Sequence, residues 1–521
     1  MKCVPTLLVL SLLVAGCQSV GPTPSPTVSE TATPTASDTA SPAGPDRQHL
    51  PTKDVELPGF AAAVGGDIAA YAAQGVEWKD CYDPVDRGDA KVQPVCASVL
   101  VPYDYAAPGE RAITLKMVKV PAQDPSNGTL FMNPGGPGFG GIDIALAYAS
   151  AFDGYDVIGW NPRGTEDSTP IKCTISDVDA YLELDNSPDD ESEKQALLDA
   201  AKDFGASCYE GSGEYLAHIG TSDTVRDLDL LRQLAGDAKL NYLGFSYGTS
   251  IGGYYTQMFP DTVGRMVLDG ATALVKDDET PQAVGFEESL NAFAEWCAQK
   301  KCSLGKTAED VLASVSELLK KLDSGLAVGD RKLTQWQAVA GIAYPLYLGK
   351  SGWQDELDAL EAAIKGDGKP LLDMADDMNG RDENGEYEQS YFSFPAIVCA
   401  DENDEGLAAA DEEWGETEKL APVLGRDFEL DYVCPTWPVA PAAPLQFTNA
   451  DSGVLVIGNT GDNATPYPQA EKMAKRIGAN LLTYEGQGHT SFASGSTCVD
   501  EAVLTYFATG KLPKDGKVCK K

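Results

Sequence analysis

The chain has 521 residues and carries 39 Lys and Arg against 79 Asp and Glu, which gives a formal net charge of −40 at pH 7. A surface this acidic repels polyanions, so binding to nucleic acid or to anionic lipid surfaces is excluded as a function. The length allows one large domain with an insertion, or two domains. Only three histidines and no C-x-x-C motif are present, so we expect neither a metal site nor a cofactor.

The N-terminal segment has the features of an export signal that ends in a lipidation site. A short basic start precedes an apolar run at residues 6–15, which is too short to span a bilayer as a helix of the mature protein. The run ends in L-V-A-G-C, and this resembles the lipobox of bacterial lipoproteins. The resemblance implies cleavage before Cys17, a lipid on its sulfur and attachment to the extracytoplasmic face of the cell membrane. An ordinary secretory signal with an incidental cysteine is the alternative.

Residues 17–50 are predicted to form a disordered tether, because Thr, Ser, Pro and Ala predominate and large apolar side chains are nearly absent. His49 falls in this segment and is expected to be exposed. Beyond it, no apolar run is long and uninterrupted enough for a transmembrane helix.

Ten cysteines remain once Cys3 leaves with the signal and Cys17 is lipidated. An even number in an exported chain predicts disulfides. Pairing between sequence neighbours is the simplest pattern, and Cys81–Cys96 and Cys297–Cys302 would be the most local pairs.

Short apolar strands alternate with helices through much of the remaining chain. The predicted strands are 96–102, 112–120, 130–132, 155–159, 240–243, 265–268, 454–458 and 481–484. The predicted helices among them are 221–236, 249–258 and 466–477. This alternation predicts an α/β fold with a mostly parallel sheet covered by helices on both faces.

The pattern changes between the strands at 265–268 and 454–458. Long acidic helical stretches, such as 286–300 and 307–322, take the place of the alternation. We therefore expect a large helical cap, inserted before the strand that carries Asp462 and placed over the strand ends. The predicted division is a signal at 1–16, the tether at 17–50, core at 51–271, cap at 272–447 and core again at 448–521.

The pentapeptide at 244–248, G-F-S-Y-G, lies between a predicted strand and a predicted helix. A G-x-S-x-G motif in this setting predicts a nucleophile elbow, a sharp turn that exposes the serine hydroxyl and requires glycine on either side. A second match, centred on Ser250, would lie inside the helix, where the hydroxyl can bond to the backbone. Ser246 is therefore the predicted nucleophile.

An acyl-transfer serine needs a base and a carboxylate that orients the base. Among the histidines, His49 lies in the tether and His218 precedes a helix, where it should cap or pack. His489 follows the last predicted strand in a glycine-rich loop and is the predicted base. Asp462 is the predicted acid, because one helix and one strand bring it to a strand end beside His489. Asp269 also follows a strand and is expected to hold local backbone, with the orienting role as its alternative.

The negatively charged oxygen that forms during acyl transfer needs backbone N–H donors. The first is expected from Tyr247, directly after the nucleophile. The second is expected from the loop at 134–138, P-G-G-P-G, because glycine lets a substrate carbonyl approach the main chain closely. Gly136 is the first choice and Gly135 the second. A phosphate-binding loop is disfavoured because no G-x-x-x-x-G-K motif is present there.

Together, these motifs resemble the bacterial tripeptidyl aminopeptidases and the related prolyl aminopeptidases, which are α/β-hydrolases. The matching pieces, in the family's order, lie at 133–138, 162–164, 244–249, 267–270, 462–466 and 488–491. The resemblance implies a triad of Ser246, Asp462 and His489. It also implies an α/β-hydrolase fold and release of short peptides, tripeptides in particular, from free N-termini through an acyl-enzyme on Ser246.

Two positions depart from the family's pattern. Asn161 stands where the family often has Asp, and Pro134 stands where prolyl aminopeptidases have His. The second departure favours the tripeptidyl branch.

Two alternative functions, and the residue that would bind the substrate's free amine, stay open at this point. A free N-terminus requires a carboxylate in the cap, for which Asp401 and Glu402 are candidates, and solvated surface acids are an equally good interpretation of both. An esterase or lipase could use the same triad, with an apolar channel in place of the carboxylate. A surface lipoprotein that binds peptides without catalysis is the third possibility, against which the complete set of catalytic residues argues.

Overall fold

The computed structural model describes residues 44–123, 127–402, 405–428, 430–448 and 452–520. Cys17 and most of the predicted tether lie outside these residues. The last part of the segment predicted as tether is bound to the folded protein, because Gln48 Nε2 donates to the carbonyls of Lys202 and Thr436, each at 2.9 Å. His49 is exposed, as expected. None of the helices in the described ranges is long and apolar enough to cross a membrane.

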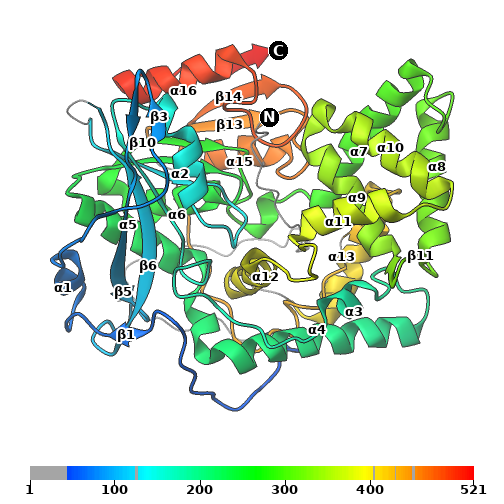
Figure 1. Ribbon diagram of the computed structural model, residues 1–521, viewed down its shortest axis with the longest axis horizontal. Coiled ribbons are helices and arrows are strands. Elements are labelled where there is room, and N and C mark those ends of the chain that lie inside the picture. The colour runs from blue at the N-terminus through cyan, green and yellow to red at the C-terminus, as the bar shows by residue number, and fades with distance from the viewer. Residues whose placement is uncertain (1–43, 124–126, 403–404, 429, 449–451, 521) are drawn as a thin grey trace, which may run out of the picture.

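The core is one large sheet, seen on the left of Figure 1. In the described residues it has 11 strands. Their order is β15 (Lys517–Lys520), β14 (Asn480–Glu485), β13 (Leu455–Asn459), β10 (Val263–Asp269), β9 (Leu240–Phe245), β7 (Thr129–Asn133), β8 (Asp156–Trp160), β6 (Arg111–Val120), β5 (Val95–Pro102) and β2 (Lys79–Asp80), with β1 (Ala61–Ala62) paired to β6. Every pair from β15 to β8 is parallel, and the pairs of β1, β2, β5 and β6 are antiparallel. The predicted strands are all present, with ends shifted by at most two residues.

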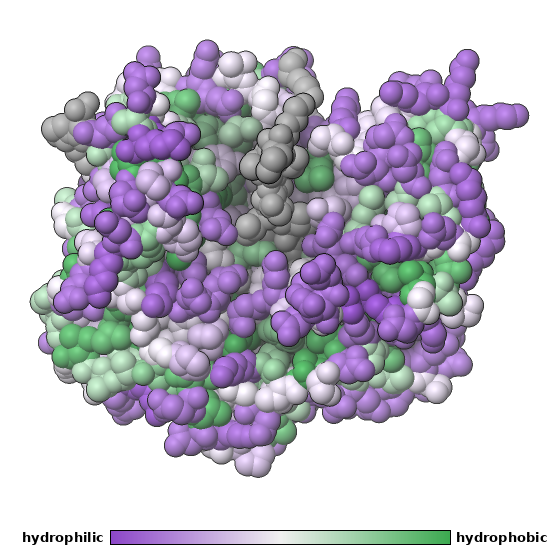
Figure 2. All heavy atoms as spheres, viewed as in Figure 1, coloured by the Kyte–Doolittle hydropathy of each residue, from purple (hydrophilic) through white to green (hydrophobic). Residues whose placement is uncertain are grey.

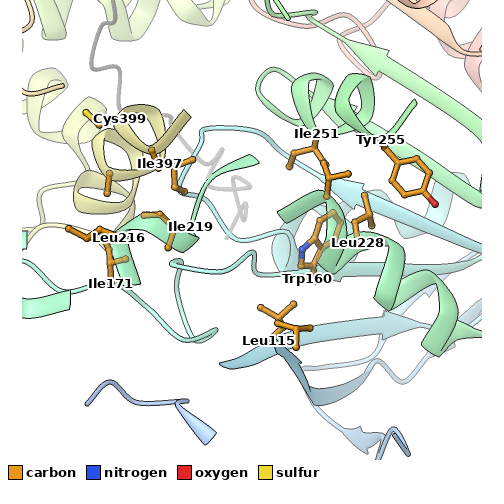
Figure 3. Close-up of a cluster of buried hydrophobic side chains, with 14 of the residues drawn as sticks. Leu115, Trp160, Ile171, Leu216, Ile219, Leu228, Ile251, Tyr255, Ile397 and Cys399 are labelled. Atoms are coloured by element: carbon orange, nitrogen blue, oxygen red, sulfur yellow. The ribbon is translucent and has the colours of Figure 1, made fainter. Parts of the chain in front are cut away.

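Helices cover both faces of the sheet, as predicted. Buried side chains of α5 (Thr221–Ala235), α6 (Gly248–Met258) and α15 (Tyr467–Ile477) pack on one face. Those of α2 (Ile142–Tyr148) and α16 (Thr497–Thr509) pack on the other. Figure 3 shows part of the first cluster, where Trp160 of the sheet meets Leu228 of α5 and Ile251 of α6. Because both faces are covered, the central strands are mostly apolar along their length. They could therefore be predicted as short apolar runs in the sequence.

Between β10 and β13 the chain forms a helical cap, on the right of Figure 1. Its elements are α7 (Gln282–Lys300), α8 (Ala308–Leu322), β11 (Leu326–Val328), β12 (Arg331–Leu333), α9 (Gln335–Tyr347), α10 (Trp353–Ile364), α11 (Lys369–Asn379), α12 (Gln389–Asp401), α13 (Leu407–Leu420) and α14 (Gly425–Phe428). The cap has an apolar core of its own, which includes Phe293, Val315 and Ile342. The helices expected at 286–300 and 307–322 correspond to α7 and α8. Hydrophilic side chains cover most of the face seen in Figure 2, over core and cap alike.

Helix α12 packs several fully buried side chains into the apolar core that carries the sheet. Its Ile397 and Cys399 lie beside Ile219 in Figure 3. Its first turns touch the glycine loop: a Cβ on Gly138 would lie 2.9 Å from the backbone nitrogen of Phe394. The cap is therefore fastened directly over the loops at the carboxyl ends of the strands.

Two helices between β8 and β9 are not among the predicted elements, α3 (Val178–Leu182) and α4 (Glu191–Ser212). Asp179 of α3 binds the guanidinium of Arg381 in the cap through two contacts of 2.7 Å. Helix α4 begins with a capping box, in which Asp190 and Glu193 each bond to the other's backbone N–H. A segment outside the predicted insertion, helix α3, thus also contacts and stabilises the cap.

The ten cysteines of the folded part form five disulfides between sequence neighbours, as predicted. They are Cys81–Cys96, Cys173–Cys208, Cys297–Cys302, Cys399–Cys434 and Cys498–Cys519. The longest separation is 35 residues, so each bridge stabilises a local piece of the structure.

The motif at 162–164 contributes a buried ion pair. Arg163 donates to both carboxylate oxygens of Asp227 at 2.7 Å, and to the carbonyls of Pro102 at 3.0 Å and His218 at 2.8 Å. The ring of His218 packs 4.8 Å from that of Tyr103, between centroids, and burial lowers the pKa of His218. His218 therefore packs, as expected, and Arg163 joins its carbonyl to the end of β5 and to α5.

Candidate active site

Ser246 lies in the tight turn between β9 and α6. Its φ angle is 53°, in the left-handed region that residues other than glycine rarely adopt. Its N–H donates to the carbonyl of Asp269, at 3.0 Å, at the end of the neighbouring strand. A Cβ on Gly244 would lie only 2.4 Å from the carbonyl oxygen of Gly248. Strand, strained serine and helix, with glycine required on either side, form the arrangement of a nucleophile elbow.

Ser250 lies one turn further along α6. The expectation that its hydroxyl bonds to the backbone is wrong, because it pairs with Thr272 Oγ1 at 2.6 Å. Thr272 follows β10 and comes within reach because α6 packs against the end of that strand. The hydroxyl of Ser250 is thereby occupied in a structural contact.

His489 and Asp462 meet at the carboxyl ends of two adjacent strands. Asp462 follows β13 and His489 follows β14, and these strands are parallel neighbours. His489 Nδ1 lies 2.7 Å from Asp462 Oδ1, and Thr465 Oγ1 lies 3.3 Å from the same nitrogen. With its proton on Nδ1, the imidazole has a lone pair on Nε2, and this atom is buried without a hydrogen-bond partner among the described residues. An imidazole held in this way can accept a proton from a serine.

Asp269 holds backbone, as expected. Its carboxylate accepts from the N–H of Ser491, at 3.0 and 3.1 Å, and from that of Phe492, at 2.7 Å. Burial raises the pKa of Asp269 to about 6, although these two N–H groups act in the opposite direction. Because Ser491 and Phe492 directly follow the base, Asp269 fixes the loop that carries His489.

The glycine loop lies directly against the elbow. A Cβ on Gly135 would be 2.8 Å from Ser246 Cβ and 3.0 Å from the backbone nitrogen of Tyr247. The N–H of Gly135 is occupied, because it donates to Asn133 Oδ1 at 2.9 Å. Gly136 therefore stays the preferred second donor. Tyr247 is the N-cap residue of α6, where the first N–H groups have no partner within the helix and the helix dipole favours negative charge.

Asp401 reaches the elbow through one hydroxyl group. It accepts from the N–H of Thr221 at 2.7 Å and from its Oγ1 at 2.6 Å, and the same Oγ1 hydrogen-bonds to the Tyr247 hydroxyl. Burial raises the pKa of Asp401 to about 7. Burial, together with the nearby carboxylate of Glu279, also raises the pKa of Glu402 well above its usual range. Both acids are half-buried, so neither is a fully solvated surface residue.

Tyr347, the last residue of α9, joins the cap to this site and is not among the residues predicted from the sequence. Its carbonyl accepts from the N–H of His489 at 3.2 Å, and its ring stands edge-on to the imidazole with centroids 4.9 Å apart. The preceding carbonyl, of Leu346, accepts from Asn463 Nδ2 at 2.6 Å. Nothing in the local sequence could have marked Tyr347, since a tyrosine in an apolar helix is typical of a packed core.

Comparison with known proteins gives matches over nearly the whole chain. A family model described as TAP-like protein matches residues 421–519. The serine protease Hip1 of Mycobacterium tuberculosis is 32% identical over 497 residues, which cover 89% of this chain and 95% of that protein. The tripeptidyl aminopeptidase of Streptomyces lividans is 31% identical over 499 residues, covering 88% of this chain and 89% of that protein. Carboxylesterase B of Mycobacterium tuberculosis is 33% identical over 501 residues, covering 89% of this chain and 93% of that protein. The chain therefore belongs to the tripeptidyl aminopeptidase-like family of α/β-hydrolase serine peptidases.

Proposed function

We propose that this serine peptidase is exported, is anchored by a lipid on Cys17 to the extracytoplasmic face of the cell membrane, and releases tripeptides from free N-termini. The observation that carries the catalytic part is the pairing of His489 with Asp462, at the edge of the sheet where β9 ends in the elbow serine, Ser246. The name of the Streptomyces lividans relative supports the tripeptide unit. The lipobox-like sequence and the tether support export and anchoring.

The geometry supports an acyl-enzyme mechanism. The Oγ of Ser246 adds to the scissile carbonyl carbon while its proton passes to Nε2 of His489, and Asp462 stabilises the imidazolium that forms. The carbonyl oxygen takes up the negative charge and accepts hydrogen bonds from the N–H groups of Tyr247 and Gly136. His489 then gives its proton to the departing amine. Water then adds to the carbonyl carbon of the acyl-enzyme while its proton passes to Nε2 of His489. His489 returns this proton to the Oγ of Ser246 as the released peptide departs.

A peptide with a free N-terminus brings a positive charge into the cap, and this charge needs a carboxylate partner. Asp401 and Glu402 are our candidates for it, since both lie half-buried at the end of α12, and Asp401 is bonded through Thr221 to the elbow. A carboxyl group whose pKa is near 7 in the free protein ionises when an ammonium group binds beside it.

An esterase is the second candidate function, and the relative named carboxylesterase B favours it. The same triad would serve, because acyl transfer from an ester and from an amide share the addition step. The two functions differ in what the cap must recognise, an ammonium group or an apolar acyl chain.

Hydrolysis of one fluorogenic tripeptide amide, with its amine free and then acetylated, separates these functions. We expect the free form to be cleaved with a kcat/KM at least about 100-fold higher, because acetylation leaves a half-buried carboxylate without its partner at a cost of about 3 kcal/mol. Equal cleavage of both forms would contradict an exopeptidase. Hydrolysis of simple esters with neither peptide cleaved would establish the esterase instead.

Lipid anchoring is tested by the variant Cys17→Ser in a bacterial host that processes lipoproteins. Wild type should partition into the detergent phase of a Triton X-114 extract, because a lipidated N-terminus binds micelles, and the variant should partition into the aqueous phase. Cys3→Ser is the matched control, since Cys3 belongs to the predicted signal, and it should behave as wild type. Wild type in the aqueous phase would contradict the anchor.

A further inference from the structure

The hydroxyl group of Tyr347 is buried beside the hydroxyl of Ser246. Its oxygen is shut off from solvent and makes no hydrogen bond of regular geometry within the described residues. A buried hydroxyl without a partner is unfavourable, whereas phenylalanine would fill the same space without that loss. The hydroxyl therefore points to a partner that arrives with the substrate.

The position of this hydroxyl is fixed tightly with respect to the triad. The backbone of Tyr347 is bonded to the N–H of His489, and its ring packs edge-on against the imidazole. The bond from Asn463 to Leu346 holds the end of α9 to the loop that carries Asp462. A side chain anchored at both its backbone and its ring cannot swing away from the site without moving the base.

The neighbours of the hydroxyl identify it as a neutral donor. Burial, and then the charge of Asp462, raise the pKa of Tyr347 well above its ordinary value, and the only opposing influence is a contact with the hydroxyl of Ser246. The phenol thus lies beside the nucleophile and keeps its proton throughout the range in which a histidine base works. It can donate a hydrogen bond but cannot take the serine proton.

We propose that Tyr347 is a third oxyanion donor, supplied by the cap. As Ser246 Oγ bonds to the carbonyl carbon and its proton moves to His489 Nε2, the π pair of the carbonyl moves onto its oxygen. That oxygen accepts a hydrogen bond from the Tyr347 hydroxyl, in addition to those from the backbone. No proton leaves Tyr347, and the bond is released when the carbonyl re-forms and the leaving group departs. The inference rests on the serine chemistry of the family and not on the proposed tripeptide specificity.

The test is Tyr347→Phe, which keeps the ring against His489 and removes only the hydroxyl. Tyr344→Phe is the matched control, because it makes the same change one turn earlier on α9. With p-nitrophenyl acetate, which needs no peptide subsite, we expect kcat to fall about 100-fold for Tyr347→Phe with KM nearly unchanged. The affinity for phenylboronic acid, which forms a tetrahedral anionic adduct with serine, should fall by a similar factor. Tyr344→Phe should match wild type in both assays.

A kcat unchanged in Tyr347→Phe would overturn the proposal. So would a lower kcat with unchanged affinity for phenylboronic acid, since this would assign Tyr347 to positioning His489 alone. Should the variant fail to fold, 3-fluorotyrosine placed at position 347 retains the hydroxyl. Its ¹⁹F resonance should shift when phenylboronic acid is added, and an unmoved resonance would refute the contact. Because the ester assay is independent of peptide cleavage, an inactive tripeptide substrate leaves this test intact.

Discussion

Ser246→Ala should lower kcat for the tripeptide amide by on the order of 10⁶. The variant has no atom that can form the acyl-enzyme, and what remains is the contribution of the oxyanion donors and of substrate binding. Alanine keeps the Cβ, so the bond from its N–H to the carbonyl of Asp269 and the turn itself are retained. The measurement is turnover together with labelling by a fluorophosphonate, and the melting temperature checks the fold.

The overlapping motif offers a matched control. Ser250→Ala removes a hydroxyl of the same kind one helical turn away, and it should keep both turnover and labelling, because the bond of that hydroxyl is to Thr272 and not to a residue of the triad. A label that persists on another serine in Ser246→Ala would contradict the assignment. Loss of labelling in Ser250→Ala, with the fold intact, would contradict it as well.

Asp462→Asn should lower kcat by about 10⁴ while leaving KM little changed. The Asp462 carboxylate accepts from His489 Nδ1 and so keeps the lone pair on Nε2. An asparagine amide can donate to Nδ1 instead, which places the proton on Nε2 and leaves the base unable to accept from Ser246. The imidazolium also loses its counter-charge. Steady-state kinetics of the variant at its own pH optimum measure both effects.

The comparison variant is Asp269→Asn, at the other strand end that carries an aspartate. Its carboxylate binds the backbone after His489 and not the imidazole, so we expect a lower melting temperature and a loss of kcat well below 10⁴. A larger loss of kcat in this variant than in Asp462→Asn, at equal folded fraction, would transfer the orienting role to Asp269.

The sheet and the predicted triad could be derived from the sequence because their signals are local. Strands buried on both faces become short apolar runs, and each polar group of interest lies at or just beyond the carboxyl end of one of them. Ser246 directly follows β9, Asp269 is the last residue of β10, and Asp462 and His489 lie in the loops after β13 and β14. The parallel arrangement then brings these ends to one edge. For the acid and the base, the distance of 2.7 Å between Asp462 and His489 agrees with that derivation.

What the sequence could not provide depends on contacts between distant segments. Tyr347 meets His489 only because the end of α9 folds back onto the core, and no pattern near either residue marks this. From the sequence, Glu356 would be placed on the polar face of an amphipathic helix, exposed to solvent. In the structure its carboxyl group is fully buried in the cap, and burial raises its pKa well above the ordinary value. The capping box of α4, in contrast, is a local signal that could have predicted that helix.

The disulfide pattern has a consequence for how the chain acquires its covalent structure. Ten cysteines admit on the order of 10³ pairings, but here each bridge joins a cysteine to the next one along the chain, and no two bridges interleave. Under the proposed export, in which Cys3 leaves with the signal and Cys17 carries a lipid, the chain would enter an oxidising compartment N-terminus first. Every second one of these ten thiols to emerge would then find its partner as the only one of them still free. On that proposal, the order of translocation would itself select the native connectivity, with little reshuffling by a disulfide isomerase.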